Sequence, residues 1–492
     1  MRQALHILRK DVRHLSIEIA ATLLAVCGFV YTAARSPLSG WHAPLPQTVA
    51  SFLITFLLPF AWWVLIVRLV HGENLIGDRE FWPTRPYSWS SLLLSKLLFV
   101  AIFINLPMLI AQAVVVQAHG FSPFAELPGL LWSQLLLTLA FFLPVAAIAA
   151  ITSGLAQFLV AGLVAYVAML LLSMQFSRIA VAMVGGWGPL DWIRSYYALF
   201  VAGAGATAIL LWQYARRRTL PVRVLAGAAV LAVAVGVPFS WGTAFALQSR
   251  LSRLPSAQAA LRVEAHPDFR WATRARVVPD GGVAIHIPLR ISGVADGVTP
   301  KVESLTATIQ GAGGAVWRTP AGQAMNVTVT GQLVALQTTV DRAFYDRVKD
   351  QPVTVRGSLY VTLYGNRQET KVPFTARPTA VPGLGLCSAT AVSNAPYFLT
   401  CDAVFRTQPD LVSVRFEQGA GDSVAYTPRH PLSYAPFPAQ FSLDPVYPYV
   451  LYSTFKGPLD AVTVASIEPL AYVRAPLAID GLRLADYEGA RK

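Results

Sequence analysis

The chain is short of charge. Only 13% of its 492 residues are Asp, Glu, Lys or Arg, whereas 54% are hydrophobic; soluble domains usually carry about 25% charged residues. The shortage is uneven, because the sequence through Arg250 holds 16 basic and 7 acidic residues and the remainder holds 23 and 19. Surplus basic residues in an apolar half are typical of segments that flank membrane spans. Neither half has a basic stripe interleaved with aromatic residues, so we expect no nucleic-acid partner.

Cysteine is also scarce. The three cysteines, Cys27, Cys387 and Cys401, are too few for a disulfide-dense scaffold and lack the spacing of a zinc ribbon. Cys387 and Cys401 lie close together on either side of Asn394 and Pro396, which favour a turn. We therefore expect a disulfide between them if this half lies in an oxidising compartment. The alternative is a pair of buried, reduced thiols.

Motifs for catalysis are missing as well. The sequence contains no G-x-x-x-x-G-K-[ST] phosphate loop, no H-E-x-x-H metal motif and no G-x-S-x-G nucleophile elbow, and its eight histidines are scattered. We therefore expect no catalytic residue, no metal site and no cofactor in this chain. Any ATP hydrolysis would be performed by a partner subunit.

Long hydrophobic runs are what the first half does contain. Seven stretches are long enough, or nearly so, to cross a bilayer core, which takes about 20 helical residues. They are 17–34, 49–70, 92–116, 127–151, 155–174, 195–212 and 222–247. Neutral polar residues in these runs more often pair between helices than bind substrate; they include Asn105, Gln112, Gln134 and Gln157. The lack of charged residues near the middle of any run counts against proton-coupled transport.

The distribution of basic residues predicts the orientation. They cluster before the first run (Arg2, Arg9, Lys10, Arg13), after the second (Arg68, Arg79, Arg85, Lys96) and after the sixth (Arg216, Arg217, Arg218, Arg223). The alternate connections hold only Arg35, Arg178 and Arg194. The positive-inside rule therefore places the N-terminus in the cytoplasm. An odd number of spans places the chain after about residue 247 outside, so we expect a multi-pass protein of the bacterial inner (cytoplasmic) membrane.

The second half has the pattern of strands. Apolar and polar residues alternate in 283–291, 301–309, 326–340, 353–365, 370–376, 397–405, 411–418 and 462–470. Short strands separated by turn residues favour a sandwich over βαβ units. We therefore predict a mixed fold: a transmembrane helical domain over 1–250, a β-sandwich-like outer domain over 251–379, and a second β-rich part over 380–492. The sequence leaves open whether the outer region forms one large sandwich or two small ones.

The connection after the second run is the most informative segment. Between residues 78 and 99 it reads DREFWPTRPYSWSSLLLSKLLF, which mixes charged and aromatic residues with two prolines and continues into an apolar helix. Prolines shorten the flexible path, and aromatic residues offer a large contact area, so the segment suits docking of a partner. An interfacial loop is the alternative, since Trp and Tyr gather at headgroup depth. The residues expected to dock are Asp78, Arg79, Glu80, Phe81, Trp82, Arg85 and Lys96.

This run, from Asp78 through Thr84–Arg85–Pro86 to Lys96, resembles the matching connection in permease subunits of ABC-2 type transporters. In that family the connection contains the coupling helix that docks into a separate ATPase subunit. Residues 4–15 are similar to the family's elbow helix, and 175–194 occupy the place of its short re-entrant helices. The resemblance covers about the first 215 residues. It implies an ABC ATPase partner that uses ATP, a lipid bilayer, and room for a second permease copy.

The sequence therefore predicts the membrane-spanning permease subunit of an ABC-2 type transporter, with an outer β domain that binds substrate or an envelope partner. A seventh span and a large outer domain depart from the family's pattern. The alternative is a membrane-anchored binding or scaffold protein whose β domain does the work. An enzyme embedded in the membrane is a third reading.

Overall fold

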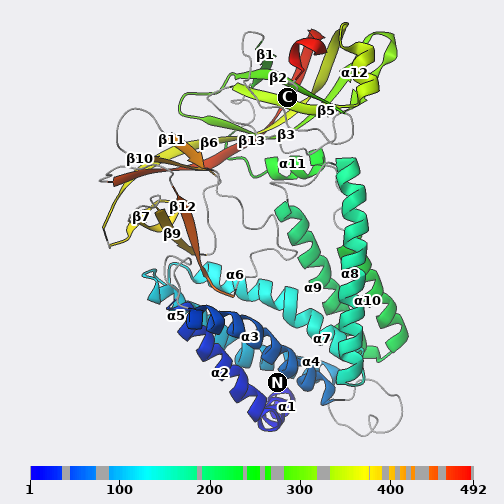
Figure 1. Ribbon diagram of the computed structural model, residues 1–492. Helices are drawn as coiled ribbons and strands as arrows, with labels where there is room; N and C mark the ends of the chain where they lie inside the picture. Colours follow the sequence, from blue (N-terminus) through cyan, green and yellow to red (C-terminus); the bar gives the residue numbers. More distant parts are fainter. Residues whose placement is uncertain are drawn as a thin grey trace.

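The structure is a computed structural model with a helical part that holds the N-terminus and a sheet-rich part that holds the C-terminus (Figure 1). It describes residues 2–35, 45–73, 88–184, 191–235, 241–254, 261–266, 282–318, 333–375, 377–390, 398–404, 411–416, 423–426, 443–452 and 461–488. A membrane helical domain followed by a β-rich region is thus the architecture of the chain.

The helical part follows the apolar runs. Its helices are α1 (Arg2–His14), α2 (Ser16–Ala33), α3 (Leu45–His71), α4 (Trp89–Val100), α5 (Leu106–Ala118), α6 (Leu127–Leu137), α7 (Leu143–Ala150), α8 (Leu155–Val184), α9 (Asp191–Arg216), α10 (Thr219–Val235) and α11 (Trp241–Ser249). Two π-helical turns, η1 (Ala101–Asn105) and η2 (Thr138–Phe142), join α4 to α5 and α6 to α7.

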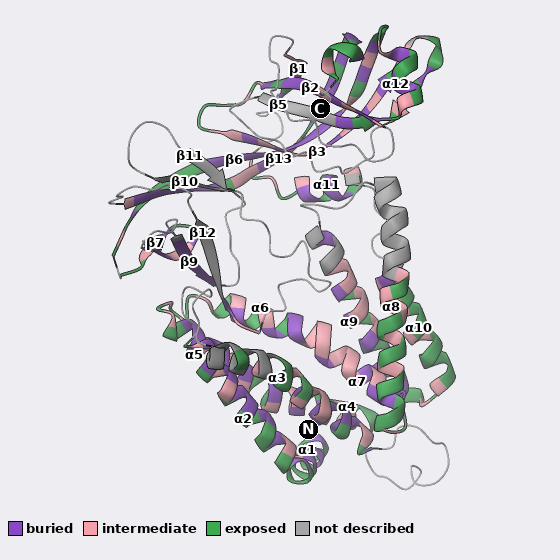
Figure 2. Cartoon of the chain, in the orientation of Figure 1, coloured by how far each residue is buried: buried purple, intermediate pink, exposed green. Residues whose placement is uncertain are grey.

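Five helical segments among the described residues are long and apolar enough to cross a membrane: Ser16–Ala33, Trp89–Ala118, Leu127–Ala150, Leu155–Leu172 and Tyr196–Arg216. The shorter apolar segments Phe56–His71 and Thr219–Ala234 occupy the second and seventh predicted runs. Large apolar side chains lie exposed along α8, as expected for a lipid-facing helix (Figure 2). The chain is therefore a multi-pass membrane protein.

Two predicted boundaries differ from the structure. The run predicted over 222–247 overlaps two of the described helices: α10 extends to Val235, and α11, which begins at Trp241, packs against the sheet through Phe245. The short helices implied for 175–194 are also not seen among the described residues, because α8 continues to Val184 and α9 begins at Asp191. Hydropathy alone does not report that the sheet covers the Phe245 side chain.

The β-rich part contains two sheets within the described residues. The first has nine strands, in the order β4-β3-β6-β13-β1-β2-β5, with β10 beside β13 and β11 beside β10. The second, sheet B, has four strands in the order β12-β9-β8-β7. The strands of the large sheet, sheet A, are β1 (Arg262–Ala265), β2 (Val283–Ser292), β3 (Thr299–Gln310), β4 (Val316–Arg318), β5 (Leu333–Val340), β6 (Pro352–Pro373), β10 (Leu411–Phe416), β11 (Ser423–Tyr426) and β13 (Ala461–Arg483). Those of sheet B are β7 (Thr379–Val381), β8 (Gly385–Thr390), β9 (Phe398–Val404) and β12 (Val446–Tyr452).

A long antiparallel ribbon of β6 and β13 joins two separate cores. The 22 residues of β6 and the 23 of β13 pair along their length, with register shifts near Glu468 and Ala471. One half of the ribbon packs with β2, β3 and the short helix α12 (Arg342–Val348). The other half, through Val372, Val462 and Val464, packs under sheet B. The ribbon is therefore the shared scaffold of both cores.

The ribbon also crosses the proposed division at residues 379 and 380. Strands β10, β11 and β13 come from the second predicted part, yet they pair within the sheet built by the first. The strands predicted over 353–365 and 370–376 belong to the single strand β6. Alternation shows where a residue points, and a long strand that changes partners along its length looks like two strands in the sequence.

Candidate functional site

A cluster of buried charges lies at the end of the bundle that holds the N-terminus. The Lys96 ammonium lies 2.8 Å from a carboxylate oxygen of Asp11 and 3.3 Å from one of Glu73. Their exposed fractions are only 5%, 7% and 4%. A buried charge is costly unless it is paired and hydrogen-bonded, and Lys96 meets this condition with two carboxylates.

Three elements position this ion cluster. On α1, Asp11 follows Ala4, Ile7 and Leu8 at helical spacing, so its side chain lies on the buried face of an amphipathic helix. On α4, Lys96 lies on the buried face beside Leu92 and Phe99.

The third element is the end of α3, where Glu73 directly follows the helix and Gly72. Helix α4 begins at Trp89 because the Ser88 hydroxyl accepts a hydrogen bond from the Ser91 backbone N–H at 3.2 Å. The Ser91 hydroxyl also donates to the Gln3 side chain at 3.3 Å. Helix α4 is thus fixed both to the end of α3 and to the N-terminal helix.

The predicted docking segment lies between these anchors. Of its residues, Asp78, Arg79, Glu80, Phe81, Trp82 and Arg85 lie outside the described residues. Lys96 is described, and it faces inward to the ion cluster instead of outward to a partner. It can therefore act on a partner only through the elements it holds together.

Sequence reasoning missed Asp11 and Glu73. A signal was present for each: Asp11 is an acid on the apolar face of a basic amphipathic helix, and Glu73 is an acid at the end of an apolar run. Pairing them with Lys96 needs the fold, because the sequence separations are 85 and 23 residues.

Neutral polar side chains pair between helices in the middle of the bundle, as the sequence predicts. The Gln134 amide donates to the Gln112 carbonyl at 2.8 Å, and the Asn105 amide donates to the Thr138 hydroxyl at 3.2 Å. Gln157 instead accepts from Ser153 at the start of α8. Interhelical hydrogen bonds of this kind stabilise membrane helix packing.

The Asn105–Thr138 contact also joins the two π-helical turns. Each turn precedes a proline, Pro107 in α5 and Pro144 in α7. Proline lacks the N–H that an α-helix needs, and π turns are found where a helix adjusts to such a defect or serves a function. The two spans therefore have matched irregularities that face each other at one contact.

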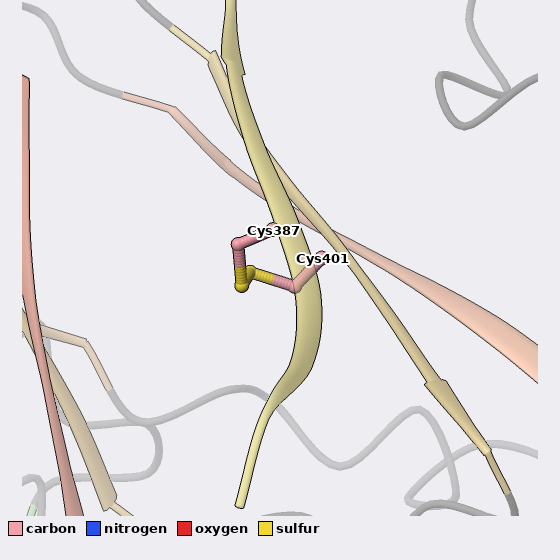
Figure 3. The surroundings of a disulfide bond; sticks show 2 residues. All are labelled: Cys387 and Cys401. Carbon is pink, nitrogen blue, oxygen red and sulfur yellow. A yellow bond between two sulfur atoms is a disulfide. The ribbon is translucent and has the colours of Figure 1, made fainter. Parts of the chain in front are cut away.

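The sheet-rich part of the chain contains the predicted cysteine pair. The structure joins Cys387 and Cys401 by a disulfide (Figure 3). The two residues are direct partners on β8 and β9, and their Cα atoms are 3.9 Å apart. This separation is below the roughly 4.4–6.8 Å that the sequence argument expects, and the register of β8 and β9 places the two cysteines directly opposite each other. The turn expected at Asn394 and Pro396 lies outside the described residues.

The sheet-rich part contacts the bundle at two places. At the first, Phe245 of α11 packs against Tyr360 and Tyr472 with ring centroids 5.0 and 6.3 Å apart. At the second, Val404 and Val446 of sheet B are buried in the same apolar core as α5. Among the described residues, no group of three or more His, Cys, Asp or Glu is placed to hold a metal ion. Comparison of the chain with protein-family models, curated proteins and solved structures finds no match.

Proposed function

We propose that this chain is the membrane-spanning permease subunit of an ABC-2 type transporter, working with a separate ATPase subunit. The observation that carries the proposal is the buried ion cluster of Asp11, Glu73 and Lys96. It ties together both ends of the predicted docking segment and the N-terminal helix. A helical bundle that served only as an anchor would have no need to fix these three elements with buried charges.

The cluster gives a physical route for force. Glu73 is the last described residue before the docking segment, and α4 begins just after it. A partner that pulled on the segment would displace α4 and α1 together, since separating Lys96 from its carboxylates would leave a buried charge uncompensated. α4 continues through η1 into α5, so the displacement would reach the contact between Asn105 and Thr138.

We place this end in the cytoplasm and the β-rich part outside, with all seven apolar segments as spans. The basic residues support this orientation. Arg223 reaches the backbone of Ile151, and His71 contacts Ala149 and Thr152, so the ends of α3, α7 and α10 lie at one level. The basic residues at the matching chain positions are Arg9, Lys10, Arg13, Arg68, Arg216 and Arg218. The positive-inside rule favours the cytoplasm for this end. The outer domain would then bind substrate or another envelope component.

One observation favours the second candidate, a membrane-anchored binding or scaffold protein. The outer part has two apolar cores and a disulfide of its own. Such a domain could bind a partner while the helices only hold it at the membrane. The two candidates differ in whether residues 78–85 contact an ATPase.

Co-purification separates them. Tagged full-length chain would be isolated in mild detergent from native membranes, and Mg-ATP hydrolysis that co-elutes would be measured. We expect hydrolysis with the natural chain and its loss with Phe81→Ala/Trp82→Ala at equal yield of the membrane subunit. Trp132→Ala is the matched control, because Trp132 is an exposed aromatic residue on α6. Equal hydrolysis with the double variant would remove the docking assignment, and no hydrolysis with any chain would favour the scaffold.

A further inference from the structure

Sheet B has two faces that serve different neighbours. On β9, Leu399 and Cys401 belong to the core shared with the β6–β13 ribbon, whereas Val404 belongs to the core of the helical bundle. Successive strand residues point to opposite faces, so Asp402 shares the bundle-facing side with Val404. Val446, the cross-strand neighbour of Val404, is buried in the same bundle core. Sheet B therefore lies between the ribbon and the outer end of the bundle.

The bundle-facing side inserts a loop among the helices. The Gln112 amide of α5 donates a hydrogen bond to the Leu443 backbone oxygen at 3.0 Å, and the Leu443 side chain packs on the bundle core. Just beyond α5, Gly120 has φ +87° and approaches the Leu386 side chain of β8. The chain just before β12 thus reaches the same polar pair, Gln112 and Gln134, that joins α5 to α6.

Two carboxyl groups and a histidine meet at this junction. Asp402 is 2% exposed, and its Oδ2 atom has no hydrogen-bond partner within the described residues. Asp444, next to Leu443, accepts a hydrogen bond from the Val446 backbone at 3.0 Å. His119 directly follows α5, next to the Gly120 that approaches sheet B, and its charge lowers the pKa of both carboxyls.

The histidine's proton placement follows from its backbone contact. His119 Nδ1 lies 3.0 Å from the Val115 carbonyl oxygen, which can only accept, so Nδ1 donates this hydrogen bond. Within the described part of the chain, Asp444 also raises the pKa of Asp402.

We propose that Asp402, Asp444 and His119 form a proton-binding latch, which holds residues 443–446 of the outer domain in the outer end of the α5–α6 pair. The ligand is a proton on the carboxyl pair. Binding it closes the latch, and losing it favours release of sheet B from the bundle. This inference is independent of the proposed transport function, because it concerns only the junction of two parts of this chain.

Burial gives the direction of the effect. Desolvation raises the pKa of Asp402 and that of Asp444 from 3.8 to about 6 in the docked state. Release exposes the carboxyls and returns their pKa values towards 3.8. Because the pKa is raised in the docked state, the stabilisation of that state is complete at pH values below the pKa of the released carboxyls. It is lost as the pH rises through about 6. Docking should therefore strengthen between pH 7 and pH 5, by about tenfold for each independent carboxyl.

The test measures how accessible position 446 is. Val446→Cys would be made in full-length chain with Cys27→Ser, in the membrane or in mild detergent and without reductant. Its maleimide labelling rate would be divided by the rate at Ala295→Cys, an exposed site on the outer domain, measured at the same pH. The ratio removes the intrinsic pH dependence of the thiol. We expect the ratio to fall at least about tenfold from pH 7 to pH 5.

Variants decide whether the carboxyls are responsible. Asp402→Asn/Asp444→Asn imitates the protonated pair and should give a low ratio at both pH values, whereas Asp296→Asn, at an exposed aspartate, should keep the natural profile. If the double variant fails to fold, Gln112→Leu is informative because it removes the hydrogen bond to Leu443 and should raise the ratio at both pH values. A ratio that is equal at pH 5 and pH 7 in the natural chain overturns the proposal. So does a double variant that labels as fast as the natural chain at pH 7.

Discussion

The cluster of Lys96, Asp11 and Glu73 at the N-terminal end of the bundle can be compared with His119, Asp402 and Asp444 at the end that meets sheet B. Lys96, Asp11, Glu73 and Asp402 are buried, whereas His119 and Asp444 are partly exposed. At the first end an ammonium lies 2.8 and 3.3 Å from its carboxylates. At the second, a carboxyl oxygen of Asp402 has no partner among the described residues, and burial raises the carboxyl pKa values to about 6.

The difference shows two ways to keep acids inside a protein. A fixed counter-ion makes the contact permanent and makes its removal costly. A carboxyl without a fixed counter-ion is most stable when it carries a proton, so its contact responds to pH. We therefore expect the N-terminal cluster to be a rigid joint and the outer cluster to be an adjustable one. The following predictions test this contrast.

The largest expected effect concerns the side of the membrane. If the two clusters lie on opposite sides, a phosphatase that is active only outside the cytoplasm should work when fused after Lys492 and fail when fused within 216–223. The reason is the odd number of proposed spans between the N-terminus and the outer domain. Enzyme activity in whole cells, corrected for fusion protein level, is the measurement. The reverse pattern would place the Lys96 cluster outside the cytoplasm and the Asp402 cluster inside it.

The next effect concerns the buried ion cluster of Asp11, Glu73 and Lys96. Lys96→Met should destabilise the bundle by about 3–5 kcal/mol, because two buried carboxylates lose their counter-ion. Thermal unfolding of the purified chain in detergent measures this. The triple variant Asp11→Asn/Glu73→Gln/Lys96→Met should recover most of the loss.

A matched control is Lys349→Met. Lys349 pairs with Asp346 at 3.3 Å on the surface of the outer domain, and exposed pairs contribute about 0–1 kcal/mol. Equal effects of the Lys96 and Lys349 variants would show that burial does not distinguish these two ion pairs.

The third prediction concerns the disulfide in sheet B, the sheet that carries Asp402. Cys387 and Cys401 lie on the opposite face of the strands that carry Asp402 and Leu386. Replacing both cysteines with alanine should destabilise the outer domain by about 3 kcal/mol in the chain-entropy model. Unfolding followed by protease resistance of the outer domain measures the loss. Alkylation with and without reductant tests the bond first, and two freely alkylated thiols in unreduced, denatured protein would contradict it.

The fourth prediction concerns the direction in which the charge of Asp402 changes the stability of the junction between sheet B and the bundle. Asp402→Asn should stabilise the docked junction at pH 7, because it removes a charge that burial disfavours. The shift from 3.8 to about 6 corresponds to about 3 kcal/mol at most. Hydrogen exchange at β9 and β12, at pH 7 and pH 5, is the measurement. A stabilisation that is equally large at pH 5 would have a cause other than ionisation.

The sequence predicts the helical half better than the outer half. Hydropathy finds apolar runs because a helix satisfies its own backbone within one segment. A sheet does not, and β13 pairs with β6, β1 and β10, which lie far apart in the chain. Alternation finds the strands but carries no information on their order.

The charged clusters show the same limit. The sequence selects Lys96 for its place after the Thr84–Arg85–Pro86 motif, and not for the acids that it contacts. Asp402 and Asp444 look like ordinary surface acids, because nothing local says that the end of α5 covers them. Buried charge is a property of contacts between distant segments. The cysteine pair is the exception, since sequence proximity already limits how far apart two thiols can lie.

The smallest expected effect completes the comparison at a site where neither burial nor helix packing operates. Arg356 donates to both carboxylate oxygens of Asp480, at 2.8 and 3.0 Å, across the exposed side of the β6–β13 ribbon. The side chains are 50% and 64% exposed, so water and salt already screen both charges. A double-mutant cycle with Arg356→Ala and Asp480→Ala should therefore give a coupling of about 0–1 kcal/mol, and added salt should reduce it further. If this coupling matched the loss caused by Lys96→Met, the cost of removing Lys96 would come from the ion pair alone. If the Arg356–Asp480 coupling is small and the loss of stability caused by Lys96→Met is large, the difference comes from the two carboxylates that the Lys96 variant leaves buried without a counter-ion.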